Sequence, residues 1–267
     1  MSAVLLGYVG IGAVAGVLAG LLGVGGGLVI VPMLVIVFTR QGLPAESLMH
    51  VALGTSMASI VFTSVSSFRA HQQRGAVDWS IVRRITPGIL AGTFFGTWVA
   101  SRLSTALLKG CFTAFLYVVA VQMLLDAKPR PTRGIPGAAG TTAVGAAIGV
   151  VSSLVGIGGG SLSVPFMTWC NVPVHRAIGT SAAIGFPIAL AGSAGYIVNG
   201  LQAGGLPPHT LGFVFLPALA GIVAASMMTA PLGARIAHRL PVPQLKRAFA
   251  ALLLVMGTRL LFDLLRQ

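Results

Sequence analysis

Two short glycine-rich runs are the first feature of the sequence that could do chemistry. They occur in the matched stretches GVGGGLVIVPML (residues 23–34) and GIGGGSLSVPFM (residues 156–167) and consist of Gly25, Gly26, Gly27, Gly158, Gly159 and Gly160. Each run interrupts an apolar segment, and a proline follows five residues later. A helix break at membrane depth leaves backbone N–H and C=O groups that lipid cannot satisfy, so it must line a cavity or be buried in protein. Paired breaks therefore predict a transport site, with close helix packing by small residues as the alternative.

A second matched motif supplies hydroxyl groups. Gly-Thr-Ser occurs at residues 54–56 and again at 179–181, and its hydroxyl-bearing residues are Thr55, Ser56, Thr180 and Ser181. Hydroxyls and free backbone N–H groups beside a helix N-terminus suit an anion, because the positive end of the helix dipole points at it. We therefore expect these residues and the glycine runs to bind substrate. The competing interpretation is that each hydroxyl bonds to a carbonyl of its own helix or of a neighbour.

Two further pairs of polar residues occupy matched positions. His50 and His175 each lie four residues before a Gly-Thr pair, and Gln122 matches Arg259 at an offset of 137 residues. Gating or proton coupling is one interpretation of these four residues. The alternatives are a histidine ring that packs at the membrane interface and an Arg259 side chain that snorkels to the surface.

The acidic residues exclude several chemistries. Glu46, Asp78, Asp126 and Asp263 fall in expected loops or at segment ends, so no buried carboxylate is predicted to bind sodium or relay protons. No paired carboxylates, HExxH motif or Ser/His/Asp set is visible, and the glycine runs lack the Lys-Ser/Thr pair of a P-loop. The two cysteines lack CxxC spacing. We expect no catalytic residue, no metal site and no cofactor, and hence no enzyme.

The composition of the chain places these motifs in a membrane. Hydrophobic residues make up 55% of the 267 residues and charged residues only 8%, whereas soluble domains carry about 25% charged residues. The apolar runs are long and uninterrupted, which favours helices over the alternating strands of a β-barrel. The net charge of +13 comes from basic residues in short loops, where they set membrane orientation, so no nucleic-acid partner is predicted.

Ten apolar segments are predicted, and most approach the roughly 20 residues needed to cross a bilayer. They cover residues 3–23, 28–38, 48–68, 85–101, 107–125, 138–156, 161–170, 177–199, 211–231 and 246–262. The segments at 28–38 and 161–170 are too short to cross comfortably and are predicted to be re-entrant or half-helix pieces. The fold class is therefore an all-α polytopic membrane protein with broken or re-entrant helices at the glycine runs.

The ten segments divide into two halves of five. The glycine runs match at an offset of 133 residues and the Gly-Thr-Ser motifs at 125. We predict a first inverted repeat at 1–125, a cytoplasmic linker at 126–137 and a second inverted repeat at 138–267, because halves with an odd number of segments have opposite orientations. By the positive-inside rule, loops 69–84, 126–137, 171–176 and 232–247 face the cytoplasm and both termini face out.

The duplicated GxGGGxxxxP motif with its Gly-Thr-Ser segment resembles the TauE/SafE sulfite exporters, also called the toluene-sulfonate uptake permease family (TSUP). The resemblance covers nearly the whole chain. It implies a multi-pass transporter of the bacterial inner membrane for sulfur-containing anions such as sulfite, thiosulfate or organosulfonates, with the two motifs of both halves around a central site. Leu28 follows the first glycine run where Ser161 follows the second, so the two halves need not contribute equally.

The residues and the resemblance together predict a secondary transporter. It would work by alternating access around a midplane site between the two glycine runs, with a small sulfur-containing anion and membrane lipids as partners and protons as a candidate coupling ion. An anion channel built from inverted repeats is the alternative, and a non-transporting membrane or sensor subunit is a third hypothesis. A homo-oligomer is left open.

Overall fold

The computed structural model describes residues 2–22, 26–125, 134–237 and 242–266, and this part of the chain forms ten helices and one short hairpin. The helices are α1 (Ser2–Leu22), α2 (Gly27–Arg40), α3 (Leu48–Gln72), α4 (Trp79–Arg102), α5 (Thr105–Leu124), α6 (Ala138–Val155), α7 (Gly160–Trp169), α8 (Val174–Leu201), α9 (Leu216–Ala237) and α10 (Val242–Leu265). Six of these helices are long and apolar enough to cross a membrane. The prediction of an all-α polytopic membrane protein is confirmed.

Each predicted apolar segment corresponds to one helix, and the largest differences lie at α4 and α9. Helix α4 begins at Trp79 rather than at residue 85 because the Asp78 carboxylate caps it, accepting from the backbone N–H groups of Ser80 and Ile81 at 3.0 and 3.4 Å. Helix α9 begins at Leu216 rather than at 211, since residues 210–215 form the antiparallel hairpin of β1 (Thr210–Leu211) and β2 (Val214–Phe215). Sequence reasoning did not anticipate this hairpin.

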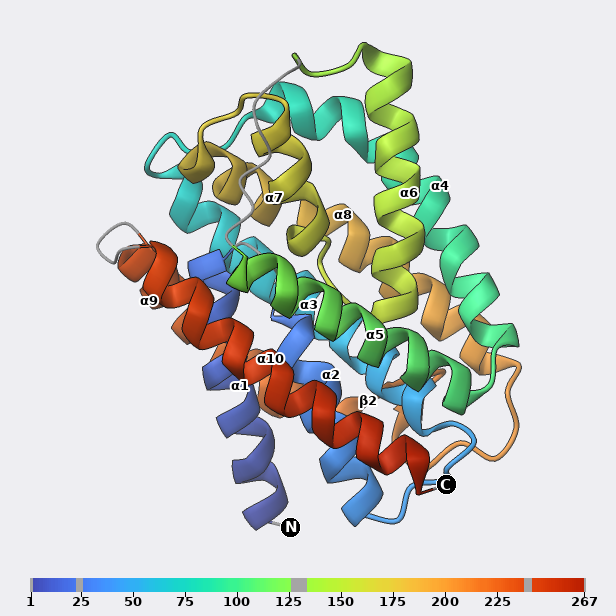
Figure 1. The fold of residues 1–267 in the computed structure, drawn as a ribbon. Coiled ribbons are helices and arrows are strands. Elements are labelled where there is room, and N and C mark those ends of the chain that lie inside the picture. The colour runs from blue at the N-terminus through green and yellow to red at the C-terminus, as the bar shows by residue number, and fades with distance from the viewer. Residues whose placement is uncertain (1, 23–25, 126–133, 238–241, 267) are drawn as a thin grey trace.

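Helices α1 and α2 form a re-entrant pair. Helix α2 has 14 residues, which at 1.5 Å per residue is about 21 Å and too short to cross the hydrocarbon. The Tyr8 hydroxyl near the start of α1 and the Gln41 side chain just after α2 are hydrogen-bonded at 2.8–3.1 Å. The chain therefore returns to the end from which it came, which is the lower end in Figure 1.

Helices α6 and α7 form the same kind of pair from the other end. The hydroxyl of Thr142, near the start of α6, donates to the carbonyl of Arg84 at 3.1 Å, and Arg176 just after α7 forms an ion pair with Asp78 at 3.6 Å. Both contacts lie where α4 begins, so α6 enters and α7 leaves at the upper end of Figure 1. The predicted short segments are thus both re-entrant.

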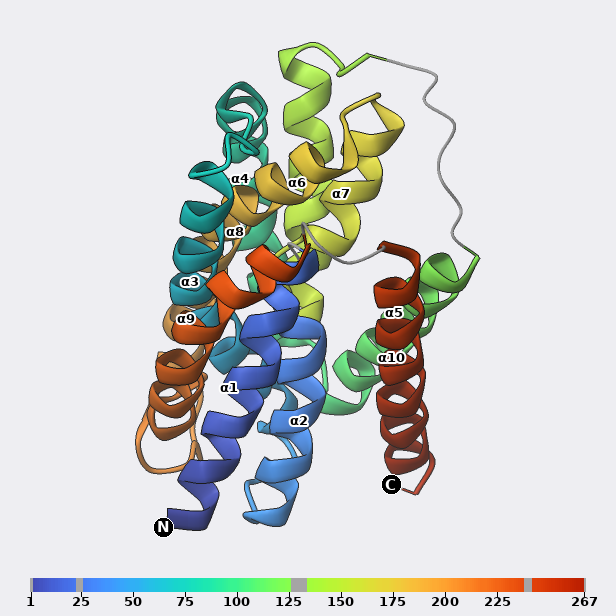
Figure 2. The same cartoon turned by 90° about the vertical axis from the view of Figure 1, so that its left-hand side faces the viewer.

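Close helix pairs surround a central contact between α3 and α8. Helix α1 packs along α9, and α4 packs along α6. Glycines spaced four residues apart bring the backbones together in both pairs, and they are Gly12, Gly16 and Gly20 in α1 and Gly88, Gly92 and Gly96 in α4. Helices α5 and α10 pack against each other at one side of the molecule, on the right in Figure 2, and they also contact α2, α3 and α6.

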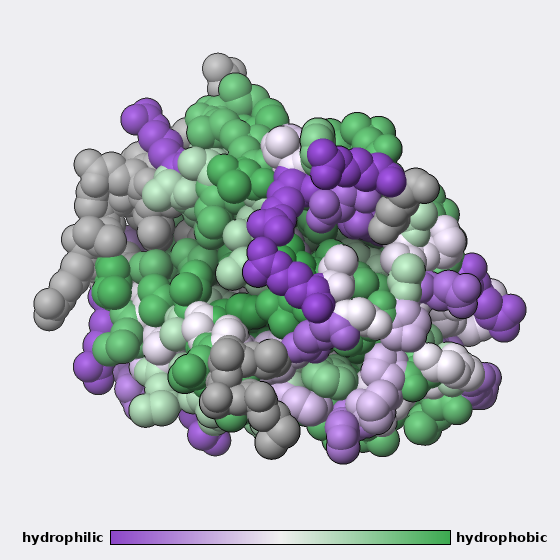
Figure 3. Space-filling model, turned by 90° about the horizontal axis from the view of Figure 1, so that it is seen from below, coloured by the Kyte–Doolittle hydropathy of each residue, from purple (hydrophilic) through white to green (hydrophobic). Residues whose placement is uncertain are grey.

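The surface agrees with a position in lipid. Large apolar side chains are exposed on the outer helices, for example Phe95, Val118, Met228 and Val255. Seen from the end at which α1 begins, hydrophilic side chains gather across part of the molecule between hydrophobic ones (Figure 3). The apolar outer faces therefore suit hydrocarbon and the polar ends suit the two aqueous interfaces.

Candidate functional site

The two glycine runs end in the same backbone conformation. Gly26 precedes α2 with φ of 79°, and Gly159 precedes α7 with φ of 73°. This left-handed region is costly for residues with a side chain, which explains glycine at both positions. The carbonyl of Gly26 accepts from the N–H groups of Val29 and Ile30, and the carbonyl of Gly159 accepts from those of Leu162 and Ser163. Gly25 lies outside the described residues.

The structure places the end of the first glycine run against the residues that precede the second run. A Cβ atom added to Gly27 would overlap the carbonyl oxygen of Gly156 and lie 2.9 Å from the Cα of Ile157. Gly156 ends α6 with φ of 67°. Because α2 starts against the chain that leaves α6, both breaks lie together inside the protein, away from lipid.

The two threonines of the Gly-Thr-Ser motifs bind backbone in matched ways. The Thr55 hydroxyl accepts from the N–H of Phe215 at 2.9 Å, and the Thr180 hydroxyl accepts from the N–H of Asp78 at 2.9 Å. Phe215 and Asp78 are the residues immediately before α9 and α4. Both threonines are fully buried. Their first role is to anchor the segments that lead into these helices, although each hydroxyl keeps its own hydrogen for a further acceptor.

The two serines lie closer to the glycine runs. The Ser56 hydroxyl donates to the Gly156 carbonyl at 2.8 Å, so α3 holds the end of α6 directly. Ser181 accepts from the Ser163 hydroxyl of α7 at 2.8 Å. The hydrogen of Ser56 is therefore committed to protein in this arrangement, whereas Ser181 belongs to a hydroxyl pair beside the second break.

The four candidate gating residues are not brought together. The buried His50 ring stacks on Phe213 with ring centroids 5.1 Å apart, and its Nε2 lies 3.1 Å from the carbonyl oxygen of Ala100. His175 is exposed at the start of α8 and therefore at the opposite end of α4. Gln122 is half-buried in α5, and Arg259 is exposed in a surface hollow of α10. The contacts of His50 match the packing interpretation.

Two hydroxyls that could serve a ligand come from residues outside the Gly-Thr-Ser motifs. Ser152 and Ser161 are buried, and their hydroxyls have no hydrogen-bond partner among the described residues, as is also true of Ser67 and Thr93. Sequence reasoning noted Ser161 only as the counterpart of Leu28 and missed Ser152. The signal available was the repeat itself, in which Ser152 stands opposite Ala19 at the offset of 133.

The surroundings of the breaks contain hydroxyl and backbone groups rather than charges. In the described ranges, no group of three or more His, Cys, Asp or Glu side chains could hold a metal ion. Asp78 is at the upper end, where the Ser80 hydroxyl donates to it at 2.6 Å and, with the other bonds to this carboxyl, holds its pKa below the ordinary value. Lys109 lies within the predicted segment 107–125 and is buried in α5.

Comparison with known proteins decides the family. The family model described as sulfite exporter TauE/SafE matches residues 8–260. The chain belongs to the TauE/SafE family. A probable membrane transporter protein of Haemophilus influenzae is 38% identical over 92% of this chain and 94% of its own length. The probable membrane transporter protein YunE of Bacillus subtilis is 30% identical over 95% of this chain and 96% of its own length.

These similarities fix the general activity. The family is described as a sulfite exporter, and the relatives are named as probable membrane transporter proteins. This multi-pass membrane protein is accordingly a membrane transporter and not an enzyme. No solved structure matches the chain. The resemblance stated from the glycine and Gly-Thr-Ser motifs is confirmed by the family match.

Proposed function

We propose that the chain is a secondary transporter of the bacterial inner membrane that carries a small sulfur-containing oxyanion, such as sulfite, thiosulfate or an organosulfonate. The observation that carries this proposal is the contact between two glycine breaks deep among buried helices, surrounded by hydroxyl groups and without carboxylates among the described neighbours. Such a site offers N–H and O–H donors to a negative charge and offers a metal cation few oxygen ligands.

The donors would act strongly because the site is dry. Electrostatic interactions strengthen as the local dielectric constant falls, and the residues around the breaks are buried. A membrane-buried anion also needs neutral donors when no Lys or Arg lies beside it. The proposed substrate residues are therefore the glycine runs with Thr55, Thr180, Ser56 and Ser181. The two serines would exchange bonds that they make with protein groups for bonds to the anion.

The proposed mechanism is alternating access between two inverted repeats. The repeat matches helices α1 to α5 with α6 to α10 in order. Under this match, the packed pair α1–α9 corresponds to the packed pair α6–α4, whereas α3–α8 and α5–α10 each correspond to themselves. The same exchange turns the bond between Thr55 and Phe215 into the bond between Thr180 and Asp78. Re-entrant pairs that enter from opposite ends support rocking of one half against the other around a fixed site.

Transport in proteoliposomes tests this proposal. The purified protein should take up at least one of radiolabelled sulfite, thiosulfate, sulfate, taurine and sulfoacetate, while protein-free liposomes should not. Uptake should saturate, and unlabelled substrate inside the vesicles should accelerate it by counter-transport. Flux that rises without saturation and shows no counter-transport would favour the anion channel. Absence of both binding and flux for all five anions would contradict the proposed function.

The coupling ion and the assembly state belong to the same proposal. An imposed pH gradient across the vesicles should change the uptake rate if protons are the coupling ion. Lipids contact the apolar outer faces, and a homo-oligomer would cover part of them.

A further inference from the structure

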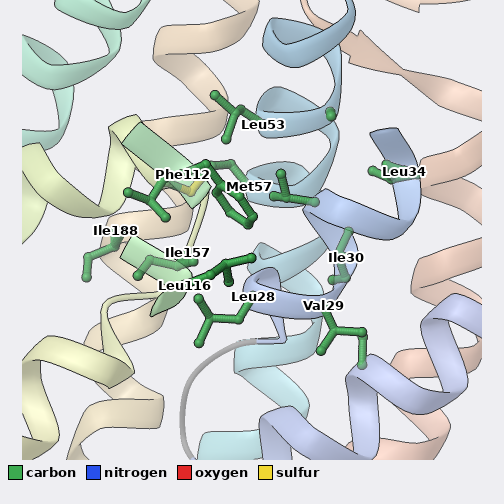
Figure 4. Packing of buried hydrophobic residues seen from close by; sticks show 14 of the residues in the cluster. Leu28, Val29, Ile30, Leu34, Leu53, Met57, Phe112, Leu116, Ile157 and Ile188 are labelled. Carbon is green, nitrogen blue, oxygen red and sulfur yellow. The ribbon is translucent and has the colours of Figure 1, made fainter. Parts of the chain in front are cut away.

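The two glycine breaks differ in the polarity of the residues that touch them. At the offset of 133 that relates the runs, Ser152 stands opposite Ala19 and Ser161 stands opposite Leu28. All four residues are buried, with exposed fractions of 0%, 1%, 6% and 0% in that order. The first break is therefore lined by apolar groups at both positions where the second break is lined by hydroxyls. Leu28 lies in the same hydrophobic cluster as Ile157 and Met57, close to them in Figure 4.

The two hydroxyls of the second break face the start of α7. A Cβ atom added to Gly159, the residue before α7, would lie 3.2 Å from the Ser152 hydroxyl oxygen. Ser161 is in the first turn of α7. Neither hydroxyl has a hydrogen-bond partner among the described residues. An unpartnered buried hydroxyl destabilises a fold, so it calls for an explanation such as a ligand or an ordered water that completes it.

Helix α8 carries a smaller residue beside the second break than α3 carries at the matched position. At the offset of 125 that relates α3 to α8, Gly185 stands opposite Ile60. The atom nearest to a Cβ added to Gly185 is the carbonyl oxygen of Gly158, at 3.3 Å. In the first half, the Cδ1 atom of Ile60 lies 3.1 Å from a Cβ added to Gly27, so an isoleucine side chain packs on the first glycine run. The second run instead has a glycine of α8 against the Gly158 carbonyl.

The start of α7 adds backbone donors to these hydroxyls. Helix α7 has ten residues, and the N–H groups of Leu162 and Ser163 already donate to the Gly159 carbonyl. Gly160 and Ser161 therefore supply the remaining N–H groups at its start. The helix dipole makes this end favourable for negative charge. Beside it lies the hydroxyl pair of Ser163 and Ser181 at 2.8 Å. At the offset of 133, Ser163 stands opposite Ile30, which is buried. This pair, too, has an apolar side chain in the first half where the second half has none.

We infer that the anion binds on one side of the pseudo-symmetric centre, at the start of α7, with its oxygens accepting from Ser152, Ser161 and the first N–H groups of the helix. The break before α2 serves as a closed packing element. The ligand class is an oxyanion with several acceptor oxygens on one sulfur atom, as in sulfite or a sulfonate. This inference rests on the proposed transport of an anion and narrows the proposed substrate residues to those of the second half. The first glycine run and Thr55 would then act in packing alone.

The test compares binding by variants of the full-length protein in detergent. The probe is whichever of sulfite, thiosulfate, sulfate, taurine and sulfoacetate raises the melting temperature most. Ser152→Ala and Ser161→Ala should each raise the Kd for this probe about tenfold or more, because a hydrogen bond to a charged ligand is lost. Gly185→Ala should also weaken binding, since its methyl group would lie 3.3 Å from the Gly158 carbonyl oxygen and crowd the second break.

Two control variants separate binding from folding. Ser193→Ala in α8 removes a buried hydroxyl that donates to the Leu190 carbonyl of its own helix, and it should leave the Kd unchanged within about twofold. Gly110→Ala in α5 adds a methyl group with no atom nearer than 3.9 Å outside its own helix, and it should likewise leave the Kd unchanged. The melting temperature without probe should not fall in Ser152→Ala or Ser161→Ala, because an unpartnered hydroxyl is removed.

The possible outcomes separate this inference from the proposed function. An unchanged Kd in both serine variants, with transport by the unaltered protein intact, would overturn the one-sided site and leave the proposed function standing. A loss of affinity in Ser56→Ala as large as in Ser161→Ala would also overturn it, because the first half would then bind the anion equally. Failure of all five probes to bind or be transported by the unaltered protein would instead contradict the proposed function.

Discussion

At the scale of single residues, the hydroxyls of Thr55 and Thr180 stabilise the fold and are also proposed substrate donors. Each accepts a hydrogen bond from the N–H that precedes a packed helix. The sequence showed that these threonines are matched, but their acceptor role depends on Phe215 and Asp78, which are distant in the chain. Backbone pairing of this kind leaves no local pattern, because any residue type supplies the same N–H group.

Replacement of the threonine hydroxyl should therefore cost stability. Thr180→Val keeps the shape of the side chain but leaves the N–H of Asp78 without its acceptor, and we expect a loss of about 1–3 kcal/mol in the free energy of unfolding. Thr55→Val should behave in the same way through Phe215. Thermal unfolding in detergent measures the effect, and Thr180→Ser, which retains the hydroxyl, is the control. Unaltered melting temperatures with reduced anion affinity would show that the threonines act only on substrate.

The glycines of the site were the part most accessible from sequence. Only glycine takes a left-handed backbone readily, and Gly26 and Gly159 both have positive φ. The hydroxyls of Ser152 and Ser161 were less accessible, because a serine in an apolar helix most often bonds to its own backbone. Their missing partners became visible only when the whole environment was known.

At the scale of helices and strands, apolar segment length and glycine or proline breaks predicted the ten helices well. The segments at 28–38 and 161–170 correspond to α2 and α7 with shifts of one or two residues at each end. The exceptions lie where polar residues continue a helix beyond the apolar run, as at the start of α4. The β1–β2 hairpin was missed because its two-residue strands carry too little alternation to be recognised.

The start of α4 depends on the capping carboxylate of Asp78. Asp78→Ala should lower the free energy of unfolding by about 1 kcal/mol, since two N–H groups lose their acceptor. The pKa of Asp78 is lowered in the folded protein, so the stabilisation is present above the pKa of the unfolded chain and is lost as pH falls through the folded value. Thermal unfolding of the unaltered protein and Asp78→Ala across acidic pH measures this difference.

Two results would contradict this account of the cap. The melting temperatures of the two proteins should converge as pH falls, and a constant gap would mean that the charge of Asp78 is irrelevant. Asp78→Asn retains an oxygen acceptor at the cap and should be less destabilising than Asp78→Ala. Equal losses in both variants would assign the effect to the ion pair with Arg176, whose side chain is 54% exposed and which we expect to contribute little.

At the scale of the whole molecule, the loops and helix ends lie in two groups, one at each end of the molecule. Arg74 donates to the Ala234 carbonyl and Arg176 pairs with Asp78, so the ends of α3 and α9 and the start of α8 lie together. At the opposite end, the Thr105 hydroxyl donates to the Glu46 carbonyl, and the Ser101 hydroxyl donates to the side-chain oxygen of Asn199 at 3.5 Å. The sequence could assign charges to loops, but only the fold places these loops beside one another.

The distribution of basic residues over the two ends then predicts the orientation in the membrane. In the described residues, the end at which α3 finishes carries Arg69, Arg74, Arg83, Arg84, Arg176 and Arg235, and the end at which α1 begins carries Arg40, Arg102 and Arg266. The other described basic residues, Lys109, Lys246, Arg247 and Arg259, lie within α5 and α10. By the positive-inside rule, the first end faces the cytoplasm. Gln73 and Gln202 are exposed residues just after α3 and α8, at opposite ends of the molecule.

Cysteine labelling in intact cells tests this orientation. In a background in which the exposed Cys111 and the buried Cys170 are replaced, Gln202→Cys should react with a membrane-impermeant maleimide and Gln73→Cys should react only after the cells are opened.

Gln41→Cys is a sharper probe, because the re-entrant path of α1 and α2 returns the chain to the side of the N-terminus. It should therefore react with the impermeant reagent in intact cells, as Gln202→Cys does. Labelling of Gln41→Cys and Gln202→Cys from opposite sides would show that α2 does not return. Labelling of Gln73→Cys and Gln202→Cys from the same side would contradict the opposed threading of α3 and α8, and with it the inverted repeats on which alternating access depends.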